Sequence, residues 1–101
     1  MATTVKALYR GAATTTTTTT LYTVPASTTA VVTNIVVTNT SGTSGTYTLA
    51  LDGISIATTV TIGPLDSIVI DMKQVLATTK TITGGASATS INFHISGVEI
   101  V

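Results

Sequence analysis

The chain has 101 residues, of which 8% are charged, and its four basic and four acidic side chains leave no net charge. A chain of this length forms one domain. Sequence-independent binding of nucleic acid requires the neutralisation of several phosphates, so a chain with scattered basic residues is not expected to bind it. Ordinary soluble domains carry about 25% charged residues. We interpret the charge-poor composition as an indication that much of the surface is buried against other subunits; the alternative is a soluble monomer covered by threonine hydroxyls.

Threonine supplies about a quarter of the residues and, with valine and isoleucine, gives the chain a strong β-branched bias. Such side chains lose rotamer freedom in helices and fit a pleated sheet. There is no cysteine, so neither a disulfide nor a thiolate metal site is expected. No apolar run is long enough for a membrane-spanning helix or a signal peptide. We therefore expect an all-β protein that is made in the cytoplasm and does not bind a membrane.

Residues 1–20 are expected to form an N-terminal arm that precedes the main domain. Residues 1–13 alternate weakly, with Val5 and Tyr9 on one face, which fits either an edge strand or an arm that reaches onto a neighbouring subunit. The seven threonines at 14–20 have no amphipathic contrast and cannot specify their own register. They fit a strand with a frayed start or a flexible linker, and we favour the strand.

The main domain is expected to span residues 21–101 and to begin with a short strand at 21–24. Pro25 ends this strand, because its ring fixes φ and holds the preceding residue in an extended conformation. The longest strand is predicted at 28–39, where apolar residues occur on both faces. Such a pattern is typical of a central strand that contacts the core on one side and a partner on the other.

Alternation along this long strand predicts which side chains meet the core and which meet a partner. Val31, Ile35 and Val37 share one face, and Val32 and Val36 share the opposite face. We therefore expect Val32 and Val36 to lie at an interface.

Further strands follow with turns at intervals of about 8–12 residues, the spacing of a sandwich. Clean alternation places Tyr47, Leu49 and Leu51 inward, and Asp52-Gly53 predicts a tight hairpin turn after them. Later strands are predicted at 54–62, 67–73, 80–83 and 90–101, with a bulge or close approach at Gly97. The sequence thus predicts a single antiparallel β-sandwich of about eight short strands, of which a jelly roll is one form.

No arrangement of side chains predicts an enzyme, and neither a cofactor nor a metal is expected. His94 is the only histidine, and no nucleophile or acid stands at a spacing that suggests a catalytic partner. We interpret it as a surface or interface residue. Positions in turns and on outward strand faces explain the aspartates better than a glycosidase pair does. Ice binding is a remote alternative, because the Thr-x-Thr pieces lack a constant period.

Two segments resemble small β-sandwich virion proteins of tailed bacteriophages. Residues 21–26 (LYTVPA), the apolar strand that ends at Asn39 and the later TYTLAL follow the pattern of the first half of these proteins. Residues 91–100 (INFHISGVEI) are similar to their C-terminal strand. The resemblance covers residues 21–101, includes no catalytic motif and does not extend to the seven threonines.

The resemblance implies a structural protein of the virion, most like a capsid decoration (cement) protein that trimerises on the shell and bridges capsomers. The implied partners are further copies of the chain and the major capsid protein or another virion protein. A tail, fibre or head-to-tail component is the alternative. The residues expected at an oligomer or partner interface are Val5, Tyr9, Val32, Val36 and His94.

Overall fold

The computed structural model describes residues 2–101 and leaves out Met1. These residues form strands and no helix, which confirms the all-β prediction. The strands are β1 (Thr3–Ala12), β2 (Thr20–Thr23), β3 (Thr29–Asn39), β4 (Gly45–Leu51), β5 (Ile54–Ile62), β6 (Ser67–Leu76), β7 (Thr81–Ala86) and β8 (Ile91–Ile100).

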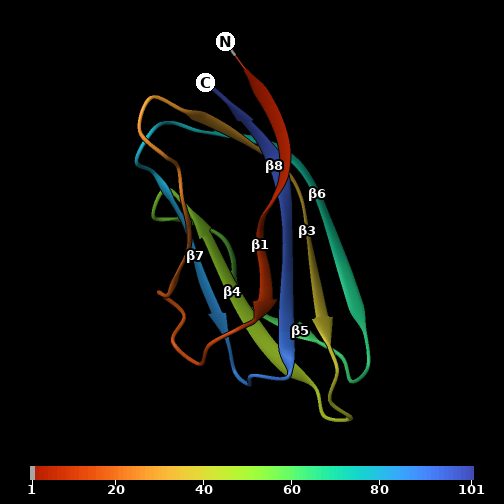
Figure 1. Cartoon of the computed structure of the whole chain (residues 1–101). Coiled ribbons are helices and arrows are strands. Elements are labelled where there is room, and N and C mark those ends of the chain that lie inside the picture. The colour runs from red at the N-terminus through yellow and green to blue at the C-terminus, as the bar shows by residue number, and fades with distance from the viewer. Residues whose placement is uncertain (1) are drawn as a thin grey trace.

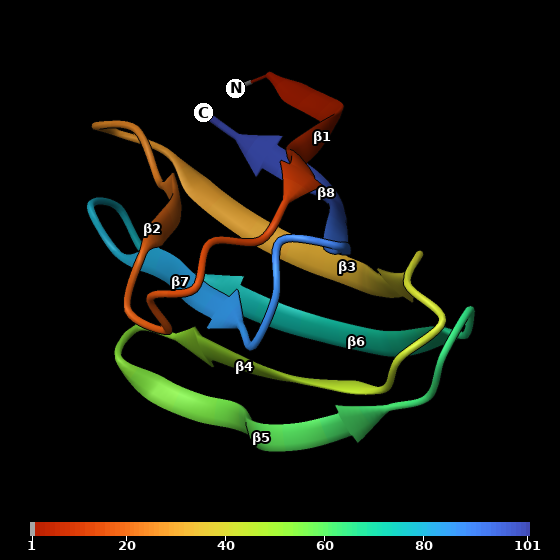
Figure 2. The same ribbon diagram turned by 90° about the horizontal axis from the view of Figure 1, so that it is seen from below.

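The strands make two antiparallel sheets of four strands each. One sheet has the order β1-β8-β3-β6, and its strands lie side by side in Figure 1. The other has the order β2-β7-β4-β5, which can be followed in Figure 2. Two sheets related by this strand order form a jelly roll. The predicted sandwich is therefore confirmed, and the jelly roll is the form that it takes.

The core lies between the two sheets and is filled by the inward residues of alternating strands. Tyr47, Leu49 and Leu51 are buried, as the sequence pattern predicts. The ring of Tyr47 meets that of Phe93 edge to face, with centroids 6.4 Å apart. Each fully buried large apolar side chain stabilises the fold by about 1.5–3 kcal/mol. Those with less than 2% exposure are Phe93, Ile35, Leu49, Ile62, Ile82, Ile91, Ile95, Val24, Val32 and Val37.

A tight turn joins β4 to β5, as predicted. Asp52 and Gly53 have φ values of 54° and 74°, so both central residues are left-handed. Positive φ at both positions defines the type I′ turn, whose twist matches that of the flanking strands.

The N-terminal residues form an edge strand rather than an arm. β1 pairs with β8 from Thr3 opposite Ile100 to Ala12 opposite Asn92. Leu8 is only 7% exposed and belongs to the core. Residues 3–12 are therefore part of the sandwich, which begins well before the expected boundary at residue 21. Figure 1 shows that both ends of the chain lie at the same end of the sandwich.

Threonines 14–19 form a loop that carries the chain from one sheet to the other, and only Thr20 belongs to β2, so the predicted strand is wrong over 14–19. The hydroxyls of Thr14 and Thr19 lie 2.6 Å apart, and each is 3.0 Å from the carbonyl oxygen of Thr16. Hydroxyls that bond to nearby backbone compete with a strand ladder. Two amides of β7 donate to the loop: Ala86 N to Thr14 O at 2.8 Å, and Gly84 N to Thr19 O at 2.9 Å.

A β-bulge at Thr33 changes which residues of β3 face the core. In the pairing of β3 with β6 and with β8, the register changes between Val32 and Asn34. Because the alternation restarts after the bulge, Val32 points inward with Ile35 and is 0% exposed. Val31 points outward instead. Val32 therefore lies in the core and not at the expected interface.

Candidate interaction face

A row of valines crosses the outer face of the β1-β8-β3-β6 sheet. The register places Val5 opposite Val98, Val98 opposite Val31, and Val31 opposite Val75, so one residue comes from each strand. Residues directly opposite one another point to the same side of a sheet. Because Val32 is buried in the core, its neighbour Val31 and the whole row face solvent.

A second row adds further apolar residues to this surface. His94 lies opposite Val36, and Val36 lies opposite Val69. We call the outward apolar residues of this sheet the valine face: Val5, Val31, Val36, Val69, Val75, Val98 and Ile100.

The exposure of these side chains is unusual for a small soluble domain. At the sheet edges Val5 is 81% exposed and Val75 67%, and Val69 is 62% exposed. On the central strands Val31 and Val98 are half-buried by their neighbours. Contiguous exposed apolar patches mark interaction sites on soluble proteins. The valine face is therefore the best candidate for a functional surface.

Charged side chains on the outer face of this sheet lie on its two edge strands. Arg10 on β1 is opposite His94, and Asp71 on β6 is opposite Asn34. Lys73 follows on the same strand as Asp71. The central strands β3 and β8 present no Lys, Arg, Asp or Glu on their outward faces. The middle of the valine face is thus uncharged, and Ser96 and Asn34 form a polar row between its two apolar rows.

Three of the five residues expected at an interface lie on this side of the sheet: Val5, Val36 and His94. A register shift after Ala7 turns Tyr9 away from them. The ring of Tyr9 packs against the core, and its hydroxyl donates a 2.9 Å hydrogen bond to Ala12 O. Val32 is buried, as described above. The pattern along single strands does not find Val31, Val75 and Val98, because only the strand register brings them together.

The titratable side chains are dispersed. Within residues 2–101 no group of three or more His, Cys, Asp or Glu residues could hold a metal ion. His94 lies on the outer face between Arg10 and Val36 in the register. Asp52, in the β4–β5 turn, forms an ion pair with Lys80 at 3.6 Å.

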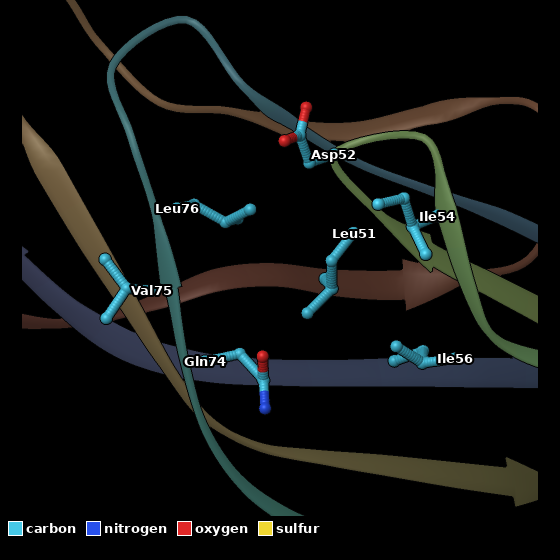
Figure 3. Close-up of a pocket in the computed structure, with 7 residues that line it drawn as sticks. All are labelled: Leu51, Asp52, Ile54, Ile56, Gln74, Val75 and Leu76. Carbon is cyan, nitrogen blue, oxygen red and sulfur yellow. The ribbon is translucent and has the colours of Figure 1, made fainter.

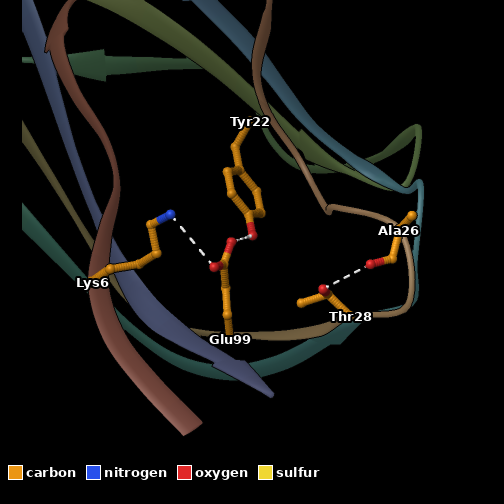
Figure 4. A network of polar contacts seen from close by, with 5 residues as sticks. All are labelled: Lys6, Tyr22, Ala26, Thr28 and Glu99. Carbon is orange, nitrogen blue, oxygen red and sulfur yellow. Dashed lines mark hydrogen bonds and ion pairs between the residues drawn. The ribbon is translucent and has the colours of Figure 1, made fainter. Parts of the chain in front are cut away.

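Glu99 connects β1, β8 and β2 at the end of the sandwich that carries both termini (Figure 4). Lys6 Nζ lies 3.4 Å from Glu99 Oε1, and the Tyr22 hydroxyl donates a hydrogen bond to Glu99 Oε2. Burial, and after it this hydrogen bond, raises the pKa of Tyr22 above its usual value of 10.0. The phenol therefore keeps its proton, and its donor role, to higher pH than a free tyrosine does.

A smaller apolar groove lies between the edge strands β5 and β6. Its volume is about 220 Å³, and Figure 3 shows the side chains that line it: Leu51, Asp52, Ile54, Ile56, Gln74, Val75 and Leu76. Ile54 is 71% exposed and Ile56 is 42% exposed. β5 carries no charge, which favours pairing with another strand. However, its register toward β4 shifts twice and Thr59 has φ 48°, and such bulges limit edge pairing.

No protein-family model matches the chain, and no curated protein matches it in sequence. Among residues 2–101, no helix is present that could cross a membrane. The fold and the surface together define a jelly-roll domain with one apolar outer sheet face.

Proposed function

We propose that the protein is a structural component of the virion of a tailed bacteriophage: a capsid decoration protein that forms homo-oligomers on the shell and stabilises it. The observation that carries this proposal is the valine face. A jelly roll with a neutral surface exposes an apolar row across every strand of one sheet. Burial of such a row against another protein is favourable by about 25 cal/mol per Å² of apolar area. The role is one of binding and assembly and includes no catalytic step.

The side chains of the valine face suit a surface that is buried on assembly. Valine has one rotatable side-chain bond and is restricted further on a strand, so its burial costs little side-chain entropy. A sheet face packs on another sheet at a separation of about 10 Å. Such a face is suited to repeated, identical contacts, as a particle shell requires.

The sequence resemblance supports the choice of this class over others with the same fold. Jelly rolls occur in viral capsid proteins, lectins and cupins, so the fold by itself is only an analogy. The segment 91–100, which is similar to the C-terminal strand of phage virion proteins, forms β8. β8 contributes Val98 and Ile100 to the valine face. The apolar strand that ends at Asn39 forms β3, so each of the two segments that carry the resemblance contributes a central strand to the candidate surface.

The location of the protein in a particle tests the proposal. Virions of the phage that encodes the chain are purified, the protein is identified by mass spectrometry, and its density is located by cryo-electron microscopy. We expect many copies on the head, and we expect particles that lack the protein to open at a lower temperature. If the protein is found in the tail, the fibres or the head-to-tail connector, it is a structural component of that part and not a capsid decoration protein. Absence from purified virions would refute the proposal.

A variant pair connects this test to the valine face. Val98→Asp places a charge in the middle of the face, whereas Thr46→Asp places one on the outward side of β4 in the other sheet. Both positions are half-buried. We expect particles that lack the protein to be decorated by the Thr46→Asp variant and not by the Val98→Asp variant. Equal decoration by both variants would show that the valine face has no part in assembly.

A further inference from the structure

We propose that the valine face is covered by the same face of a second copy of this chain, related by a two-fold axis that runs parallel to the strands. This inference rests on the proposed function, because both take the valine face as an assembly surface. It adds that the partner on this face is a second copy of the chain. A two-fold contact uses one surface twice, so the surface must be complementary to itself.

The valine row meets this requirement. Its order across the sheet is Val5, Val98, Val31 and Val75. A two-fold axis along the strands reverses the strand order and leaves the position along the strands unchanged. Val5 then faces Val75 of the second copy, and Val98 faces Val31 of the second copy. Every position of the row meets a valine, so the row itself brings no polar group into the contact.

The charged residues at the edges of this face fit the same axis. The reversal lays β1 over β6 of the second copy. The Arg10 side chain of one copy then lies two residues along the strand from Asp71 of the second copy. Lys73 of the second copy lies beyond Asp71, on the side toward the valine row, and is therefore farther from Arg10. Each contact between edge strands therefore brings a guanidinium toward a carboxylate at the exposed rim, where such pairs orient partners more than they add affinity.

Other symmetries bring the two faces together less well. A two-fold axis that crosses the strands at the middle of the sheet lays the valine row over the row that holds Arg10 and His94. If that axis instead runs along the valine row, which lies near the end of β8, much of the two faces does not overlap. A three-fold axis joins two different surfaces of each copy. The resemblance implies a trimer, but the self-complementary row favours a pair.

The area of the face is sufficient for a specific contact. Four strands of about ten residues cover roughly 600 Å² in projection, from the strand spacing and rise. Two copies together would bury about 1,200 Å², at the lower limit of stable protein interfaces. We therefore expect a dissociation constant in the micromolar range.

Sedimentation equilibrium of the intact chain tests the pair, at concentrations from about 1 μM to about 1 mM. We expect the wild-type mass to rise from that of one chain to that of two. Val98→Asp is expected to weaken the dissociation constant at least about 100-fold, because two symmetry-related carboxylates would be buried against valine. Thr46→Asp, a matched change on the opposite sheet, is expected to leave the constant unchanged. Circular dichroism verifies that both variants are folded.

Chemical cross-linking tests the axis. The chain has no cysteine, so a Val5→Cys/Val75→Cys double variant carries the only two thiols. Within one chain the two positions are three strand spacings apart, about 14 Å. Across the proposed pair they face each other at about 10 Å, which a short bismaleimide spans and a direct disulfide does not. We expect the largest cross-linked product to contain two chains, and we expect the single variant Val5→Cys to give a lower yield of it.

A wild-type protein that stays monomeric at every concentration would overturn the proposal, and so would a Val98→Asp variant with the wild-type dissociation constant. A mass of three chains, or cross-linked ladders, would overturn the two-fold axis. These outcomes are separate from the virion test. A monomer found on capsids would refute only the pair, and a stable pair absent from virions would refute only the virion role.

Discussion

A single methyl group at Gly85 is expected to separate the threonine loop from the sandwich. A Cβ at this position would press on the Thr16 carbonyl oxygen, 2.7 Å from the Thr16 carbonyl carbon and 2.9 Å from Thr14 O. These are backbone atoms, which cannot rotate away as the end of a flexible side chain can. Gly85→Ala must therefore displace the loop from β7.

The cost follows from the contacts that the loop makes. Displacement breaks the hydrogen bonds from Ala86 N to Thr14 O at 2.8 Å and from Gly84 N to Thr19 O at 2.9 Å. Each bond contributes about 0.5–1.5 kcal/mol, and a buried donor left unpaired costs about 1–3 kcal/mol. Both donor residues are buried. We expect Gly85→Ala to lower the free energy of unfolding by about 2–4 kcal/mol.

Urea denaturation gives the free energy of unfolding, and hydrogen exchange reports the two amides directly. We expect the amides of Gly84 and Ala86 to lose protection while the β3–β8 ladder keeps its protection. Gly42→Ala is the matched control, since a Cβ there meets nothing within 4 Å, and it is expected to change stability by less than about 0.5 kcal/mol. An equally small effect of Gly85→Ala, with both amides still protected, would refute the docking of the loop on β7.

Three further predictions concern the hydrogen bond from Tyr22 to Glu99, the buried side chain of Asn39 and the first strand, β1. Because the folded protein raises the pKa of Tyr22, the unfolded chain loses the phenolic proton first as the pH rises. The contribution of this group to the free energy of unfolding is therefore full below about pH 10 and declines above it. We expect Tyr22→Phe to make that decline shallower by up to about 1.4 kcal/mol per pH unit, which urea titrations from about pH 9 to about pH 11 would measure. Asn39, 1% exposed, donates to Thr43 O at 2.9 Å and Gly63 O at 3.1 Å and accepts from Ser41 N at 3.0 Å. Asn39→Ala should cost about 3 kcal/mol in the same assay, and a loss below about 1 kcal/mol would contradict this. Leu8→Ala should cost about 2–3 kcal/mol because Leu8 is a core residue, whereas an unchanged midpoint would mean that β1 contributes nothing to the core.

The β4–β5 hairpin could be predicted from the sequence because its determinants are local. Alternating Tyr47, Leu49 and Leu51 determine the inward face, and Asp52-Gly53 adopts the positive φ values that a two-residue turn needs. Each of these features depends on residues within a few positions of one another. The strand count and the sandwich follow from the same kind of local pattern.

Bulges explain the errors in the predicted faces. One additional residue at Thr33 moves Val32 to the core and Val31 to the surface. The hydroxyl of Thr33 bonds to Ser96 O at 3.1 Å, and Ser96 lies 63 positions later in the chain. A contact between residues so far apart is set by the packing of whole strands, which alternation along one strand does not contain.

The composition of the valine face depends on topology in the same way. Val75 lies beyond the predicted end of its strand at residue 73, because β6 continues to Leu76. Val5 and Val98 are separated by almost the whole chain and become neighbours only through the β1–β8 register. The sequence therefore predicts an apolar outer surface and identifies Val5 and Val36 on it, but it does not identify Val31, Val75 or Val98.

The hydrogen bonds between Ala2 and Val101 have a practical consequence for labelling the protein. Ala2 N donates to Val101 O at 3.1 Å, and Val101 N donates to Ala2 O at 2.8 Å. Both chain ends therefore leave the sandwich only a few residues from Val5 and Val98, so a bulky tag on either terminus would crowd the valine face. The loop around Gly42, at the opposite end of β3, has open space at Gly42. A fluorophore or affinity peptide inserted there would report on assembly without obstructing it.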